Sequence, residues 1–93
     1  MYVENKDGDI DGYEARIGWV SFSRSGRSVY YRGRHLKRIR RGGVFGNYRC
    51  SETEDEYWVS GVKQRGSNAH RFEPKQIHID KDAELAYRAL RAS

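Results

Sequence analysis

The most regular pattern in the first half of the chain is a pair of apolar and aromatic stretches, residues 15–24 and 27–32. In the first stretch, apolar side chains fall on both faces of an extended strand, as they do in a small barrel. Ser25-Gly26, between the stretches, is a turn signal. We therefore predict an antiparallel hairpin that pairs 16–24 with 27–32.

Later in the chain, shorter stretches rich in β-branched and aromatic residues alternate with glycine-rich or acidic segments. Such stretches are typical of strands, and the segments between them are typical of turns and loops. The predicted extended segments are 34–40, 47–50, 57–62 and 76–79, separated by a glycine-rich loop at 42–46 and an acidic turn at 52–56. Residues 47–50 only return to extended structure, so the other three segments and the two strands of the hairpin indicate about five short strands.

Near the C-terminus the period of the pattern changes to that of a helix. Asp80 suits a helix N-cap, and acidic residues follow it in the first turn, where the helix dipole favours them. Apolar residues then recur with the spacing of one helix face, at Ala83, Ala86, Tyr87 and Leu90. We predict a helix over 81–91 that covers an open end or edge of the sheet.

The opening residues 1–12 are polar, contain two glycines and show no apolar periodicity, so we predict a flexible acidic tail. Residues 13–93 are expected to form a single β-barrel-like domain that ends in the helix 81–91. The predicted fold class is mainly β with a C-terminal helix. Either a small SH3-like or OB-like barrel or a curled antiparallel sheet of about five strands fits this pattern.

Composition limits the classes of function. Of the 93 residues, 37% are hydrophobic and 13% are aromatic, so a thin core must rely on large rings. The lone Cys50 excludes an intramolecular disulfide and a zinc site built from thiolates. No apolar stretch approaches the roughly 18 residues of a membrane span. We therefore expect a cytoplasmic protein with no cofactor, no metal and no membrane partner.

Charge is unevenly distributed along the chain. The net charge is +5, yet residues 1–14 hold five acids against one lysine, and residues 52–56 hold four acids. Residues 15–51 between them hold ten cations and no acid, and nine of the ten are Arg. Arg offers a planar fork that suits phosphate, carboxylate or base edges. Two interpretations remain open: the basic run forms an exposed cationic surface, or the acidic segments fold back and neutralise it.

Tyrosines lie among these cations, and together they form a candidate binding surface. In small barrels, exposed rings stack on bases while cations follow the phosphate backbone. Tyr30 and Tyr31 are neighbours on one strand, so they point to opposite faces and one of them is expected in the core. The candidate nucleic-acid or partner-binding residues are Tyr31, Arg32, Arg34, Lys37, Arg38, Arg40, Arg41 and Tyr48, extended by a second basic loop with Lys63, Arg65 and His70.

Three short motifs resemble those of a known group of proteins. The motifs are Tyr30-Tyr31-Arg32-Gly33-Arg34, Gly46-Asn47-Tyr48, and residues 56–63 (EYWVSGVK) with His70 downstream. The pattern resembles a group of small bacterial proteins of unknown function, about as long as this chain, over roughly residues 15–90.

Some members of that group carry the transferred name deoxyxylulose-phosphate synthase, but this chain is far too short for a thiamine-diphosphate enzyme and shows no matching motif. Similar sequences often have Trp after the downstream histidine, whereas Arg71 and Phe72 follow His70 here. The resemblance implies a compact bacterial domain.

The sequence favours a binding module over an enzyme. The three histidines lack metal-binding spacing, and the clustered acids of 52–56 suit a solvated turn. The glycine-rich loop lacks the lysine and Ser/Thr of a phosphate-binding P-loop. We expect a small basic module that binds DNA or RNA through an Arg/Tyr surface. The alternative is a protein-interaction module, a regulator or inhibitor that docks on an acidic surface of a larger bacterial complex.

Overall fold

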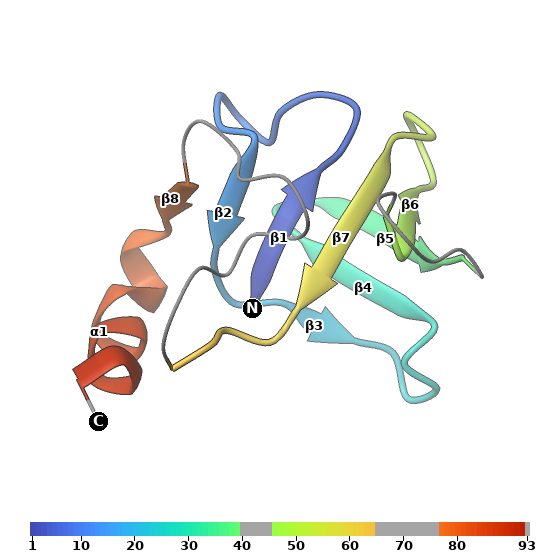
Figure 1. The fold of residues 1–93 in the computed structure, drawn as a ribbon. Coiled ribbons are helices and arrows are strands. Elements are labelled where there is room, and N and C mark those ends of the chain that lie inside the picture. The colour runs from blue at the N-terminus through green and yellow to red at the C-terminus, as the bar shows by residue number, and fades with distance from the viewer. Residues whose placement is uncertain (40–45, 65–76, 93) are drawn as a thin grey trace.

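The computed structural model of the protein describes residues 1–39, 46–64 and 77–92 (Figure 1). Within these ranges, eight strands form one sheet and a helical segment follows the last strand. The strands are Tyr2–Asn5 (β1), Ala15–Ile17 (β2), Ser21–Phe22 (β3), Ser28–Tyr31 (β4), Arg34–Arg38 (β5), Tyr48–Cys50 (β6), Glu56–Ser60 (β7) and Ile77–Ile79 (β8). A 3-10 turn, Lys81–Ala83 (η1), leads into the helix Glu84–Ala92 (α1).

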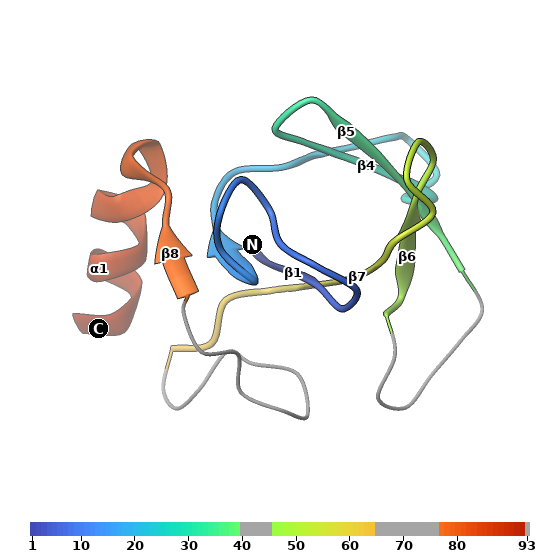
Figure 2. The same ribbon diagram turned by 90° about the horizontal axis from the view of Figure 1, so that it is seen from above.

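The sheet is curled, as the view from above in Figure 2 shows, and its strand order is β3-β4-β5-β6-β7-β1-β2-β8. Neighbouring strands are antiparallel, except that β8 pairs with β2 in parallel. The expected fold class, mainly β with a C-terminal helix, is therefore confirmed in the form of a curled half-barrel sheet. The expected number of about five strands is too low.

Besides β6, which lies in the predicted extended segment 47–50, the extra strands have two sources, and the first is the N-terminal segment. The tail predicted for residues 1–12 is wrong in its first part, because β1 lies inside the sheet, paired with β7 on one side and β2 on the other. Tyr2 and Val3 are fully buried, and so is Ile10 in the loop that follows. Two apolar residues in a four-residue strand give no readable period, whereas two neighbouring strands satisfy its whole backbone.

The second source is a break in the predicted first strand. Residues 16–24 and 27–32 do meet as predicted, with Ser21 opposite Tyr30 in the pairing of β3 with β4. However, the chain turns between β2 and β3 at Gly18, which is packed closely against two side chains. A Cβ at Gly18 would collide with the Asp80 carboxylate and would lie 2.9 Å from the Tyr31 ring. One predicted strand therefore becomes two, on different parts of the sheet.

Two hydrophobic clusters lie on opposite faces of β1. The larger one lies inside the curl and includes Val3, Leu36 and Tyr57. The smaller one is built on Tyr2 and Ile17, and partly buried side chains such as Tyr87 of α1 pack against it. The predicted helix is thus confirmed, and it lies beside β8 at one edge of the sheet (Figures 1 and 2).

Candidate functional site

An aromatic pair lies on the outer face of the β4–β5 hairpin. Arg32 and Gly33 connect the strands with φ angles of 48° and 76°, as a two-residue hairpin turn requires. The turn sets Tyr30 opposite His35, and their rings stack with centroids 4.8 Å apart and planes 13° apart. His35 Nε2 lies 2.8 Å from Ser28 Oγ, which fixes the imidazole, while Tyr30 remains 48% exposed. The hairpin therefore presents a supported ring to solvent.

The next row of outward side chains is basic. Ser28 lies opposite Lys37, Lys37 opposite Arg49, and Arg49 opposite Glu56, so this row crosses β4 to β7 on the face that carries Tyr30. Like charges directly opposite each other destabilise a sheet. No ion pair between the described residues joins Lys37 or Arg49 to an acid. Lys37 and Arg49 thus form a pair of adjacent cations on this face, with Glu56 on the far side of Arg49.

More cations lie at the open end of this hairpin. Arg38 N donates to Arg27 O at 2.8 Å, so these two residues face each other at the end opposite the Arg32-Gly33 turn. Arg24 lies in the adjacent loop, and all three side chains are exposed. The β4–β5 hairpin thus carries several cations, although Lys37 and Arg38, as consecutive strand residues, lie on opposite faces of the sheet.

The two tyrosines predicted to stack on a ligand do not face solvent. Tyr31 and Tyr48 are 3% and 4% exposed, so the expectation that Tyr31 or Tyr48 stacks on a base is wrong. The Tyr31 hydroxyl donates to Asp80 Oδ2, and the Tyr48 hydroxyl donates to Gly26 O at 3.1 Å. Burial, followed by the contact with Asp80, raises the pKa of Tyr31. The expectation that one of the adjacent tyrosines fills the core is confirmed, and Tyr30 is the one that remains outside.

Two of the predicted binding arginines are already paired with an acid of the chain. Asp11 Oδ2 accepts from Arg32 Nε at 2.7 Å, and Asp11 Oδ1 accepts from an Arg34 amino group at 2.9 Å. Hydrogen bonds from Arg34 and Arg32 hold the pKa of Asp11 well below its usual range. Of the two interpretations of the basic run, neutralisation by an acidic segment is therefore correct for Arg32 and Arg34. The acidic segment that folds back onto them is the N-terminal one.

Arg16 is enclosed rather than exposed. Its Nε lies 2.8 Å from Asp80 Oδ1, both side chains are 7% exposed, and another of its nitrogens donates to Ile10 O at 3.1 Å. Asp80 was predicted as a helix cap, but its side chain makes no capping hydrogen bond. It accepts from Arg16 and Tyr31 instead, because the carboxylate turns inward toward a buried cation.

The remaining predicted binding residues divide into two groups. Lys63 is exposed in the segment that follows β7. The other four lie outside the described residues, namely Arg40, Arg41, Arg65 and His70. Most of the glycine-rich loop 42–46 lies outside them too, and Gly46 packs so closely on the Tyr57 backbone that a Cβ there would overlap it.

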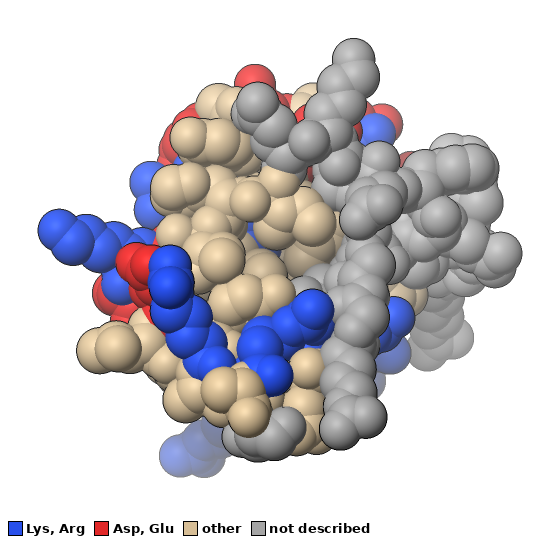
Figure 3. Space-filling model, turned by 60° about the vertical axis from the view of Figure 1, so that its left-hand side comes forward, with Lys and Arg blue, Asp and Glu red and all other residues tan. Residues whose placement is uncertain are grey.

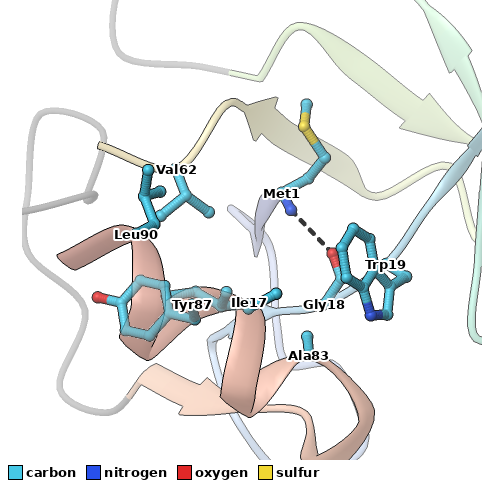
Figure 4. Close-up of a pocket in the computed structure, with 9 residues that line it drawn as sticks. Met1, Ile17, Gly18, Trp19, Val62, Ala83, Tyr87 and Leu90 are labelled. Atoms are coloured by element: carbon cyan, nitrogen blue, oxygen red, sulfur yellow. Dashed lines mark hydrogen bonds between the residues drawn. The ribbon is translucent and has the colours of Figure 1, made fainter. Parts of the chain in front are cut away.

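An apolar pocket that the sequence did not predict lies between α1 and the sheet (Figure 4). Its volume is about 210 Å³, with Val62, Tyr87 and Leu90 on one side and Met1 and Trp19 on the other. Trp19 is 60% exposed, yet its Nε1 donates to Asp82 O at 3.0 Å, which holds the ring at the rim. The sequence did contain a signal for this pocket. The apolar stripe of the predicted helix and the side chain of Trp19 need not cover each other fully, so a hollow can remain between them.

Figure 3 looks toward the side of the molecule that carries α1 in Figure 1. Neutral side chains occupy the middle of this face, and Lys and Arg side chains border it without merging into one field. Exposed apolar side chains of α1, Leu85 and Leu90, belong to this side.

Within the described ranges, no helix combines the length and the apolar character needed to cross a bilayer. In the same part of the chain, no three His, Cys, Asp or Glu side chains converge as metal ligands. Comparisons of the chain with protein-family models, with curated proteins and with solved structures give no match.

Proposed function

We propose that the protein binds nucleic acid on the outer face of the β4–β5 hairpin. The observation that carries this proposal is the exposed Tyr30 ring, stacked on His35, beside the Lys37–Arg49 pair on the same face. Small OB-like and SH3-like barrels that bind single strands combine such a ring with cations that follow the backbone. The curled sheet supports a comparison with these barrels.

The chemistry of the two contacts differs, and so does what each contributes. A base that stacks on Tyr30 gains about 1–3 kcal/mol, whatever its sequence, because every base has a π-face. The cations Lys37 and Arg49 on this face would contact phosphates, and such contacts carry no sequence information. The proposed function is therefore weakly sequence-specific binding of unpaired DNA or RNA.

Binding of this kind must weaken with salt, because each phosphate contact releases counterions. Fluorescence polarisation with a labelled mixed-sequence oligonucleotide, titrated at about 50 to 200 mM salt, measures both affinity and its salt dependence. We expect Lys37→Glu to weaken binding and to lower the salt slope by about one contact. The substitution sets a carboxylate opposite Arg49, so the fold should tolerate it.

Lys81→Glu is the matched control. Lys81 is exposed on η1, beside the opposite edge of the sheet, and the substitution changes the net charge by the same amount. An equal effect of both variants would mean that only the total charge matters. Absence of binding by the unaltered protein to any oligonucleotide at low salt would contradict the proposal.

A second candidate function is favoured by a different observation, the apolar pocket between α1 and the sheet. Exposed Trp19 and Leu90 border it, and apolar side chains of this kind can anchor a partner protein in a groove. We propose, as this alternative, that the domain docks on a larger complex through the pocket. A complex that survives nuclease treatment and is lost in the Trp19→Ala variant would support it, whereas a complex retained in that variant would contradict it.

A further inference from the structure

The Asp11 carboxylate occupies a position built by two arginines at the tip of the β4–β5 hairpin. Arg32 Nε donates to Oδ2 at 2.7 Å, and Arg34 donates to Oδ1 at 2.9 Å and to Oδ2 at 3.3 Å. A fork of guanidinium donors around a small planar anion is the geometry that proteins use for carboxylate and phosphate alike. The two arginines thus form an anion site, and a side chain of the same chain fills it.

Both arginines also have contacts that do not involve Asp11. Arg34 also donates to Arg32 O at 3.2 Å, across the hairpin turn. Arg32 has a second acidic neighbour, Asp80 Oδ1, at 3.9 Å. These contacts orient both guanidinium groups independently of the carboxylate, so the pair would keep its arrangement if Asp11 moved away.

Asp11 itself is placed so that its side chain can leave without unfolding the loop. It has a positive φ of 50°, and Gly12 follows with a φ of 99°. The preceding Ile10 is fully buried, and Arg16 donates to the backbone carbonyls of both Ile10 and Asp11. The loop backbone is therefore anchored, while the Asp11 side chain is 44% exposed at its tip.

We infer that the Arg32–Arg34 pair is a phosphate-binding site that Asp11 masks. Both ion pairs are partly exposed, with Arg32 39% and Arg34 24% accessible, and pairs of this kind add little to stability. A phosphate group offers more acceptor oxygens than a carboxylate and therefore competes for the same donors. The competition with Asp11 therefore sets the apparent affinity of the arginine pair for phosphate.

The masked site lies next to the proposed nucleic-acid surface, and its role there rests on the proposed function. The turn that carries Arg32 immediately follows Tyr30-Tyr31, and Arg34 immediately precedes His35. A nucleic-acid strand with one base stacked on Tyr30 would therefore bring a phosphate to the tip of the hairpin. Displacement of Asp11 would add Arg32 and Arg34 to the cations that contact the nucleic acid. Binding would then depend on the phosphate at the tip of the hairpin.

Asp11→Asn tests the inference, because Asn removes the charge and adopts a positive φ more readily than most residues. Inorganic phosphate is titrated at low ionic strength while the NMR resonances of Arg32 and Arg34 are followed. We expect saturable shifts of these resonances in D11N at a phosphate concentration at least fivefold lower than in the unaltered protein. The same titration of D11N carrying Arg34→Gln should show no saturation.

Asp9→Asn is the matched control, since it removes one charge from the same loop without touching an arginine. The Asp9 side chain accepts from Gly12 N at 3.5 Å and forms no ion pair between the described residues. Equal phosphate affinity in D9N and D11N, or no saturable shift in D11N, would overturn the inference. A chemical-shift map that remains native in D11N shows that the variant is folded.

Oligonucleotide binding separates this inference from the proposed function. If the proposed function holds, D11N binds the labelled oligonucleotide at least threefold more tightly than D9N, with a steeper salt slope. If no variant binds an oligonucleotide but D11N still binds phosphate at Arg32 and Arg34, the proposed function fails and the masked site stands. If oligonucleotide binds equally to D9N and D11N, the masking role is wrong.

Discussion

Arg16 Nε lies 2.8 Å from Asp80 Oδ1, and this enclosed pair joins β2 to the residue that precedes η1. The Tyr31 hydroxyl donates to the other carboxylate oxygen, so the same carboxylate also ties down β4. Strands β2 and β8 are neighbours at one end of the sheet order, whereas β4 lies near the other end. The Asp80 carboxylate therefore links two separate parts of the curled sheet.

Removal of this carboxylate should be costly. We expect Asp80→Ala to lower the free energy of unfolding by about 3–5 kcal/mol, because Arg16 would remain buried without its partner charge. Urea unfolding followed by tryptophan fluorescence measures the change. Glu84→Ala is the control, since it breaks an exposed Glu84–Arg88 pair on α1, and should change the free energy by less than about 0.5 kcal/mol. Similar losses in the two variants would show that the Asp80 contacts are not central.

A substitution at Gly18 tests the packing around the Asp80 carboxylate and the Tyr31 ring. A side chain at this position must displace the Asp80 carboxylate or the Tyr31 ring, so Gly18→Ala should destabilise the protein by roughly 1–3 kcal/mol. Gly61→Ala provides the comparison, because no atom lies within 4 Å of a Cβ built there. Thermal unfolding should separate the two variants clearly, and a Gly18→Ala protein as stable as Gly61→Ala would contradict the packing described around Asp80.

The pH dependence of stability should carry a signature of Asp11. Its pKa in the folded protein lies below its ordinary value, so the folded state favours the ionised form more than the unfolded state does. The resulting stability is present at neutral pH and is lost as the pH falls below the ordinary aspartate value of about 4. Because the carboxylate is largely exposed, the effect is small.

The Asp11→Asn variant has no such group and should therefore lose less stability on acidification. Melting temperatures of both proteins between pH 7 and pH 3 measure the difference. We expect the two curves to approach each other toward pH 3, and a constant offset over the whole range would contradict the ion pairs with Arg32 and Arg34.

Much of the fold follows from local patterns. The β-rich composition of 27–32, the turn at Ser25-Gly26 and the helical spacing from Ala83 each act over a few residues, so the sequence predicts these elements. β1 could not be predicted in this way, because its stability comes from partners on both sides rather than from its own residues. Likewise, only the folded chain shows that the acids of residues 1–12 and the arginines of the hairpin meet.

The candidate site was predicted in part for the same reason. Alternation requires that Tyr30 and Tyr31 face opposite sides, but it does not say which side is the core. The answer comes from Asp80, which follows Tyr31 by 49 positions and supplies an acceptor for its hydroxyl. The sequence therefore predicts an aromatic and basic surface, and in the structure the exposed ring is that of Tyr30.

The most direct test of the account compares two exposed aromatic rings, Tyr30 on the hairpin and Trp19 at the pocket. Their exposed fractions are 48% and 60%, so alanine should be tolerated at both positions. In oligonucleotide polarisation titrations, Tyr30→Ala should weaken binding by about 1–3 kcal/mol, or roughly 5- to 150-fold, while Trp19→Ala should bind as the unaltered protein does. Full affinity in Tyr30→Ala, or a loss confined to Trp19→Ala, would contradict the assignment of the hairpin face as the nucleic-acid surface.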